Sequence, residues 1–263
     1  MRQVYVNNKR LTKQINQGSI INNCIADNYN CEVYGVIVTP RCDLAHEGKV
    51  AHVHYLPIVS FADWYKKDGL EYLWTKQKLT YEKSIIQECN NNNFPTAHLK
   101  ETQLRLLAES LSEASKRDKF CSSISQYFNL IKTHPTDYIP KKEQKQKLIE
   151  NIRANNIAGY HLIEDWRTSD SYCVVLLRDL KRLQFNVATS LGHGIDEASI
   201  TDTRKNDLSY SIGHDLIYSI DAEIASPYVE QLMERFSHNF CRVGVEDFDN
   251  KTVETILNRV MNV

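Results

Sequence analysis

The hydrophobic pattern of the first quarter of the chain predicts two paired strands. Residues 32–39 are rich in β-branched side chains and nearly continuous in apolar character, as expected for a strand buried on both faces. Pro40 ends this strand, because proline cannot donate to the hydrogen-bond ladder. Residues 50–59 form a second apolar stretch, so the two segments predict a hairpin with a long loop between them. Residues 19–21 are a shorter strand candidate.

The middle of the chain changes to three- and four-residue apolar spacing, which predicts helices. One apolar stripe covers residues 99–114 and a second covers residues 120–131. His134 and Pro135 end the second stripe, because the residue before a proline is pushed out of the helical region. A third helix, strongly basic, is predicted to begin after Pro140.

The last part returns to strand-like segments and ends in helices. The predicted strands are residues 160–163, 172–177 and 215–220. Ser226 and Pro227 provide a hydroxyl cap followed by proline at the first helical position, which predicts a helix that Gly244 ends. A short terminal helix is predicted over residues 253–260. The chain therefore divides into a β part (1–63), a mainly helical part (64–156) and a mixed part (157–263), and its fold class is α+β.

Composition places the chain among folded, soluble, cytoplasmic proteins. It has 263 residues, 42% of them hydrophobic and 25% charged, with a net charge of −1. That balance excludes disorder and a generic basic nucleic-acid coat. The 7 cysteines form no CxxC pair, which favours reduced thiols in the cytosol. No apolar run predicts a signal peptide or a membrane span, so we expect no membrane partner.

The segment from Thr39 to His46 carries the candidate chemistry. A buried strand that ends in Thr, Arg, Cys, Asp and His places reactive side chains where a rigid scaffold positions a loop. Arg41 beside Cys42 would lower the pKa of that thiol, with His46 or His54 as its base. Cys42 is thus a candidate nucleophile of a thiol-dependent enzyme.

The same segment has a purely structural interpretation. It is a turn in which Asp43 caps main-chain amides, Cys42 packs inward and Arg41 faces water. Cys42, His46, His52 and His54 also resemble a set of metal ligands, but their spacing matches no standard structural zinc pattern. We therefore predict neither a metal nor another cofactor.

Basic side chains form two further candidate sites for anions or nucleic acid. The third helix carries a lysine run that would attract phosphates, although such runs are usually solvated faces. Arginines of the last part would form an anion site if the C-terminal helix packs beside the strands, with local ion pairs as the alternative. The tentative anion-binding residues are Lys141, Lys142, Lys145, Lys147, Arg178 and Arg242.

The strand segments of residues 17–60 resemble the core of PemK/MazF-like proteins. The resemblance rests on residues 17–21, 36–39 and 53–58, taken in that order. It implies a small SH3-like β-barrel, here interrupted by a helical insertion and completed by C-terminal strands and helices. Thr39 falls where the family has a functional hydroxyl residue. The chain departs from the family at Ser19, where members usually have Asp, and it lacks the arginine of the following loop.

Two functions follow as expectations. The first is a bacterial binding or regulatory module that acts with another protein of the same operon, in a toxin–antitoxin or phage-defence setting that the resemblance suggests. The second is an RNA-cleaving enzyme that uses Thr39, Arg41, Asp43 and His54 for acid–base chemistry. RNA is accordingly the second candidate partner. The thiol-dependent enzyme based on Cys42 is a third hypothesis.

Overall fold

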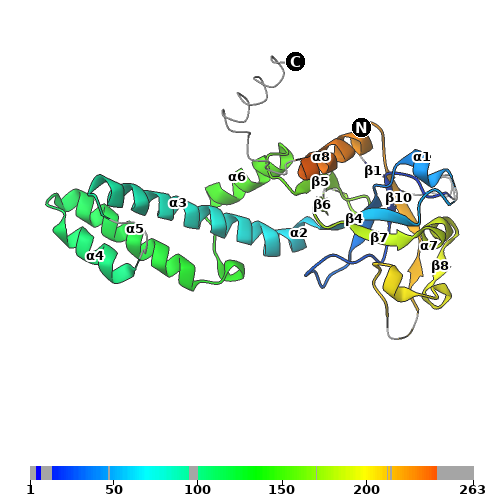
Figure 1. The fold of residues 1–263 in the computed structure, drawn as a ribbon, viewed down its shortest axis with the longest axis horizontal. Coiled ribbons are helices and arrows are strands. Elements are labelled where there is room, and N and C mark those ends of the chain that lie inside the picture. The colour runs from blue at the N-terminus through cyan, green and yellow to red at the C-terminus, as the bar shows by residue number, and fades with distance from the viewer. Residues whose placement is uncertain are drawn as a thin grey trace, which may run out of the picture.

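The protein combines an antiparallel sheet with helices on both sides and a helical arm that extends far from the sheet (Figure 1). The computed structural model describes residues 4–6, 14–46, 48–94, 100–169, 171–211, 213 and 215–241. The sheet curls into a half-barrel, and its strands come from both ends of the chain. The predicted α+β class is confirmed.

The main sheet is 8-stranded, with the order β1-β10-β2-β3-β4-β6-β5, and β7 pairs with β4 beside β6. Its strands are β1 (Val4–Val6), β2 (Ser19–Ile21), β3 (Tyr34–Ile37), β4 (His52–Ser60), β5 (Tyr160–Glu164), β6 (Tyr172–Leu176), β7 (Lys181–Gln184) and β10 (Ile220–Ile224). A separate pair consists of β8 (Ile195–Asp196) and β9 (Ile217–Tyr218).

Strand β4 organises the sheet because both of its edges are paired. One edge pairs with β3, with Tyr34 opposite Ile58, so the predicted hairpin is confirmed. The other edge pairs with β6 through its end and with β7 through its beginning, where Tyr55 lies opposite Lys181. The long strand thus joins the first part of the chain to the last.

The helices lie between or after the strands of the sheet, and most of them lie between β4 and β5. They are α1 (Arg41–Leu44), α2 (Phe61–Trp64), a π-helical turn (Tyr65–Gly69), α3 (Leu70–Asn91), α4 (Glu101–Ser110), α5 (Ala114–Lys132), α6 (Lys142–Arg153), α7 (Phe185–Ser190) and α8 (Tyr228–Cys241). Short 3₁₀ turns cover Pro135–Asp137, Leu191–His193, Glu197–Ser199 and Thr203–Lys205. Across the described ranges, no helix has both the length and the apolar character needed to cross a membrane.

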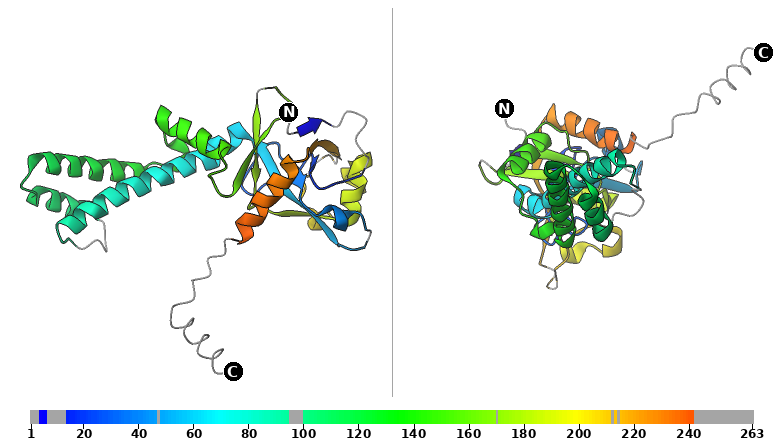
Figure 2. Two further views of the ribbon diagram at one scale, coloured as in Figure 1. Left: turned by 90° about the horizontal axis from the view of Figure 1, so that it is seen from above. Right: turned by 90° about the vertical axis from the view of Figure 1, so that its left-hand side faces the viewer.

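Alternation along the strands gives the sheet two buried faces. In β4, Val53 and Tyr55 belong to a core that α6 completes, whereas Leu56 and Ile58 face the core that α8 covers. Figure 2 shows α3, α4 and α5 side by side, away from the sheet. The arm has a core of its own, in which Ile124 is 0% exposed. Each such aliphatic side chain contributes about 1.5–3 kcal/mol through burial.

Three predicted boundaries differ from the structure. The helix expected over residues 99–114 ends at Ser110, because Leu111 is extended (φ −71°, ψ 121°) and α5 begins only at Ala114. The strand expected over residues 215–220 is divided between β9 and β10, where the Ser219 N–H donates to the Asn22 side chain (2.8 Å).

The C-terminal helix prediction was only partly right. Helix α8 begins at Tyr228, after Pro227 rather than with it. Gly244 and the terminal helix predicted over residues 253–260 lie outside the described residues, as does Leu99, the first residue of the first predicted helix.

Candidate functional site

Thr39 continues the β3–β4 pairing beyond the end of β3 through its side chain. The Val38 N–H donates to the His54 carbonyl oxygen (2.9 Å), and the His54 N–H donates to Thr39 Oγ1 (2.7 Å). Thr39 is 5% exposed, so its hydroxyl satisfies a main-chain donor in a place with little water. Pro40 follows directly, and α1 begins at Arg41.

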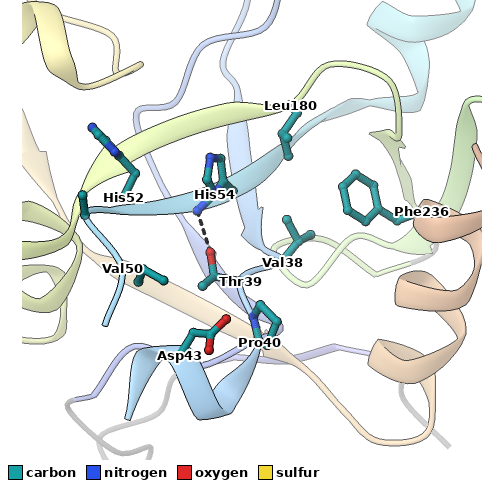
Figure 3. Close-up of a pocket in the computed structure, with 10 residues that line it drawn as sticks. Val38, Thr39, Pro40, Asp43, Val50, His52, His54, Leu180 and Phe236 are labelled. Atoms are coloured by element: carbon teal, nitrogen blue, oxygen red, sulfur yellow. Dashed lines mark hydrogen bonds between the residues drawn. The ribbon is translucent and has the colours of Figure 1, made fainter. Parts of the chain in front are cut away.

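Thr39, Asp43 and His54 line one open hollow, together with His52 (Figure 3). The hollow has a volume of about 490 Å³ and lies between the end of β3, α1 and the start of β4. Its remaining walls are mostly apolar. They are formed by Val38, Pro40, Val50, Ala51, Leu180 and Phe236. Residues from distant parts of the chain, including α8, therefore meet at the segment that the sequence singled out.

His54 is neutral at physiological pH. Burial lowers the pKa of His54 below the usual value of 6.5, and the nearby His52 and Arg182 lower it further. In the β4–β7 register, His54 lies opposite Arg182 and His52 lies opposite Gln184. Directly opposite residues project to the same face of a sheet. The hollow thus borders a strip of imidazole, amide and guanidinium groups.

Asp43 is held by a lysine of the same loop. Lys49 Nζ lies 2.5 Å from Asp43 Oδ1, and this contact lowers the pKa of the Asp43 carboxyl. The Cys42 thiol donates to the same oxygen at 3.5 Å. Asp43 is therefore an ionised carboxylate that already has a cation and a thiol as partners.

Arg41 and Cys42 lie outside the wall of the hollow. Both side chains are exposed, which confirms the solvent-facing Arg41 and shows that inward packing of Cys42 was wrong. Within the described part of the chain, no hydrogen bond joins Cys42 to His46 or His54. No three His, Cys, Asp or Glu side chains of the described residues group closely enough to hold a metal ion.

The basic candidates are dispersed. Lys141, Lys142, Lys145 and Lys147 are exposed on or beside α6. Arg178 lies near α8, where its Nε donates to Asn239 Oδ1 at 3.4 Å, but it also borders a separate hollow that contains Asp27 and Asp179. Arg242 lies outside the described residues. Arg235 of α8 donates to the main-chain oxygens of Asn155 and Tyr160, both at 2.8 Å.

Sequence reasoning missed the far wall of the hollow. Leu180 comes from the turn before β7, and Phe236 comes from α8. The only local signal for β7 is the alternation Lys-Arg-Leu-Gln, in which Lys181 and Leu183 are buried. A charged residue at a buried position conceals that alternation, so the strand was not predicted.

Comparison with known proteins adds no template for this site. No protein-family model, curated protein or solved structure matches the chain. The functional argument therefore rests on the residues of the hollow and their contacts.

Proposed function

We propose that the protein is a binding or regulatory module whose hollow receives an apolar or aromatic side chain of a partner protein. One observation carries the proposal: Thr39 and Asp43 already have structural partners, while much of the wall of the hollow is apolar. Thr39 accepts the His54 N–H and Asp43 pairs with Lys49, whereas Leu180 leaves 42% of its surface exposed. Apolar pockets of this kind accept the buried anchor residues that dominate many protein interfaces.

The neutral His54 imidazole gives the hollow its selectivity. His54 lines the hollow beside the apolar wall, and a neutral imidazole both donates and accepts a hydrogen bond. A tyrosine or tryptophan anchor fits such a surface, because it has an apolar body and a polar tip. The partner that we propose is another protein of the same operon, and the toxin–antitoxin or phage-defence setting comes from the PemK/MazF-like resemblance.

The same resemblance underlies a finer proposal about the fold. We propose that the half-barrel is an SH3-like barrel into which residues 64–156 are inserted. Its support is that β2, β3 and β4 adjoin β6 and β7 in one curled sheet, while the arm helices occupy the chain between β4 and β5.

Affinity capture from the native host tests the proposed function. A Leu180→Arg variant places a charge in the wall of the hollow and should lose a partner that the wild type captures. Leu79→Arg is the matched control, because Leu79 is 48% exposed on α3, outside the hollow. Capture of the same protein in equal amount by wild type and Leu180→Arg would refute the proposal.

A second candidate, RNA cleavage, is favoured by a specific observation. Thr39, Asp43 and His54 line the same hollow, and Arg182 lies opposite the neutral His54, which is the form of histidine that acts as a base. Cleavage of total RNA by the wild type, but not by His54→Ala, would support it. Activity that Cys42→Ser abolishes would instead revive the thiol-dependent hypothesis.

A further inference from the structure

The outer edge of β5 presents main-chain hydrogen-bonding groups that no other described strand uses. The Leu177 N–H donates to the Gly159 oxygen (2.8 Å) and the Asp165 N–H to the Ser171 oxygen (3.0 Å), in register with β6. Hydrogen-bonded pairs alternate along an antiparallel ladder. His161 and Ile163 therefore bond to β6, whereas the N–H and C=O of Leu162 point away from it.

Part of this outer edge is already covered, and part is open. The Tyr160 oxygen accepts from Arg235 Nη2 at 2.8 Å. No described residue forms a hydrogen bond with the main chain of Leu162, and β5 is the last strand of its sheet on this side. An open strand edge of this kind is a template for pairing with another chain.

A groove of about 870 Å³ runs beside this edge, and we name it the β5 groove. Helices α6 and α8 lie on either side of β5 (Figure 1). On the α6 side the groove is lined by Phe61, Ile149 and Leu162, and on the α8 side by His161 and Gln231. Ile149 is 49% exposed, so the apolar side of the groove is open to solvent.

Two polar groups in the groove have no partner among the described residues. His161 is 5% exposed, yet its Nδ1 makes no hydrogen bond with any described residue. Arg153 ends α6 just before β5 begins, is exposed, and forms no ion pair within the described part of the chain. A buried polar atom without a partner calls for one from a ligand or water. An exposed cation that lines a groove favours an acidic group in a ligand.

We propose that the β5 groove binds an extended peptide segment of a partner protein as an added strand on β5. The main chain of the peptide pairs with Leu162, because β-strand addition uses the free edge of a sheet. Its alternate side chains are apolar toward Phe61 and Ile149 and polar toward His161. An acidic residue of the peptide lies beside Arg153. This second surface goes beyond the proposed function and does not depend on it.

A peptide array tests the inference with defined probes. Synthetic peptides alternate valine, isoleucine or phenylalanine with threonine, asparagine or aspartate, and fluorescence polarisation then measures the affinity of the best binder. Leu162→Pro removes the outward N–H without removing a bond to β6, and proline is tolerated at strand edges. We expect at least about tenfold weaker binding by this variant. Leu162→Ala keeps the N–H and should bind more tightly than Leu162→Pro.

A second pair of variants tests the charge of Arg153 and leaves the main-chain hydrogen bonds of β5 unchanged. Arg153→Glu should weaken the binding of aspartate-containing peptides about tenfold, whereas Arg153→Lys should keep most of it. In the peptide, N-methylation of the amides that face β5 should abolish binding, whereas N-methylation of the alternate amides should not. The thermal unfolding midpoint of each protein variant shows that it is folded.

Three results would overturn the inference. They are an array without a binder, binding that folded Leu162→Pro retains in full, and equal effects of N-methylation at all amides. Leu180→Arg separates this inference from the proposed function, because it should leave peptide binding unchanged. Native capture that Leu180→Arg leaves unchanged, together with peptide binding that Leu162→Pro weakens, would reject only the proposed function. Native capture that Leu180→Arg loses, together with peptide binding that Leu162→Pro retains in full, would reject only the β5 groove.

Discussion

Replacement of Thr39 by valine tests whether the Thr39 hydroxyl stabilises the fold, as opposed to serving a chemical reaction. Valine has nearly the shape of threonine but no oxygen, so it removes the acceptor that lies 2.7 Å from the His54 nitrogen. Thr39 is 5% exposed, and water has little access to replace that acceptor. An unsatisfied buried main-chain donor costs about 1–3 kcal/mol. The added methyl group regains less than about 1 kcal/mol. We therefore expect Thr39→Val to lower the free energy of unfolding by about 1–2 kcal/mol.

Two assays check this expectation. Urea denaturation measures the free energy of unfolding, and amide hydrogen exchange measures the protection of the His54 N–H directly. Thr39→Ser is the control, because it keeps the acceptor and loses one methyl group, at a cost of about 1 kcal/mol. It should leave the His54 amide protected. A Thr39→Val protein with wild-type stability and a fully protected His54 amide would refute the reasoning.

Three further predictions concern other buried groups. Burial lowers the pKa of His161 from 6.5 to about 4. A proton therefore binds the unfolded chain more readily than the folded chain, and the thermal unfolding midpoint should fall as the pH drops from 6.5 towards 4. His161→Gln should flatten that fall. Lys181 pairs with Asp179 and Asp27, whose side chains are 15% and 73% exposed. In urea denaturation, Asp179→Asn should therefore lower the free energy of unfolding by about 1–3 kcal/mol, and Asp27→Asn by less than about 1 kcal/mol. Ile124→Ala should destabilise the arm by about 2–5 kcal/mol, seen as earlier loss of helical circular dichroism, without changing amide protection in β4.

The strands that depend on local composition could be predicted from the sequence. Residues 32–39 and 50–59 contain β3 and β4, because β-branched and apolar residues of that density have few other ways to be buried. Strand β7 could not be predicted, because the buried Lys181 conceals its apolar alternation and its pairing partner β4 lies far away in the chain. Pairings of that kind leave no mark on the local pattern.

The candidate site could likewise be predicted only in part from the sequence. The chain segment from Thr39 to Asp43 indicated where the hollow lies, because polar residues directly followed a buried strand. The role of Thr39 could not be predicted, since its hydroxyl serves a main-chain N–H 15 positions further along the chain. Leu180 and Phe236 reach the hollow only through the pairing of β7 and the position of α8. Neither contact has a local signal.

Photo-crosslinking from the wall of the hollow tests the central claim most directly. A photoreactive phenylalanine replaces Leu180 in one protein and Leu79 in another, and both are irradiated in the native host. We predict that position 180 becomes covalently joined to one partner protein and that position 79 does not. Crosslinks to RNA alone from position 180, or the same protein crosslinked equally from both positions, would contradict the assignment of the hollow as a protein-binding site.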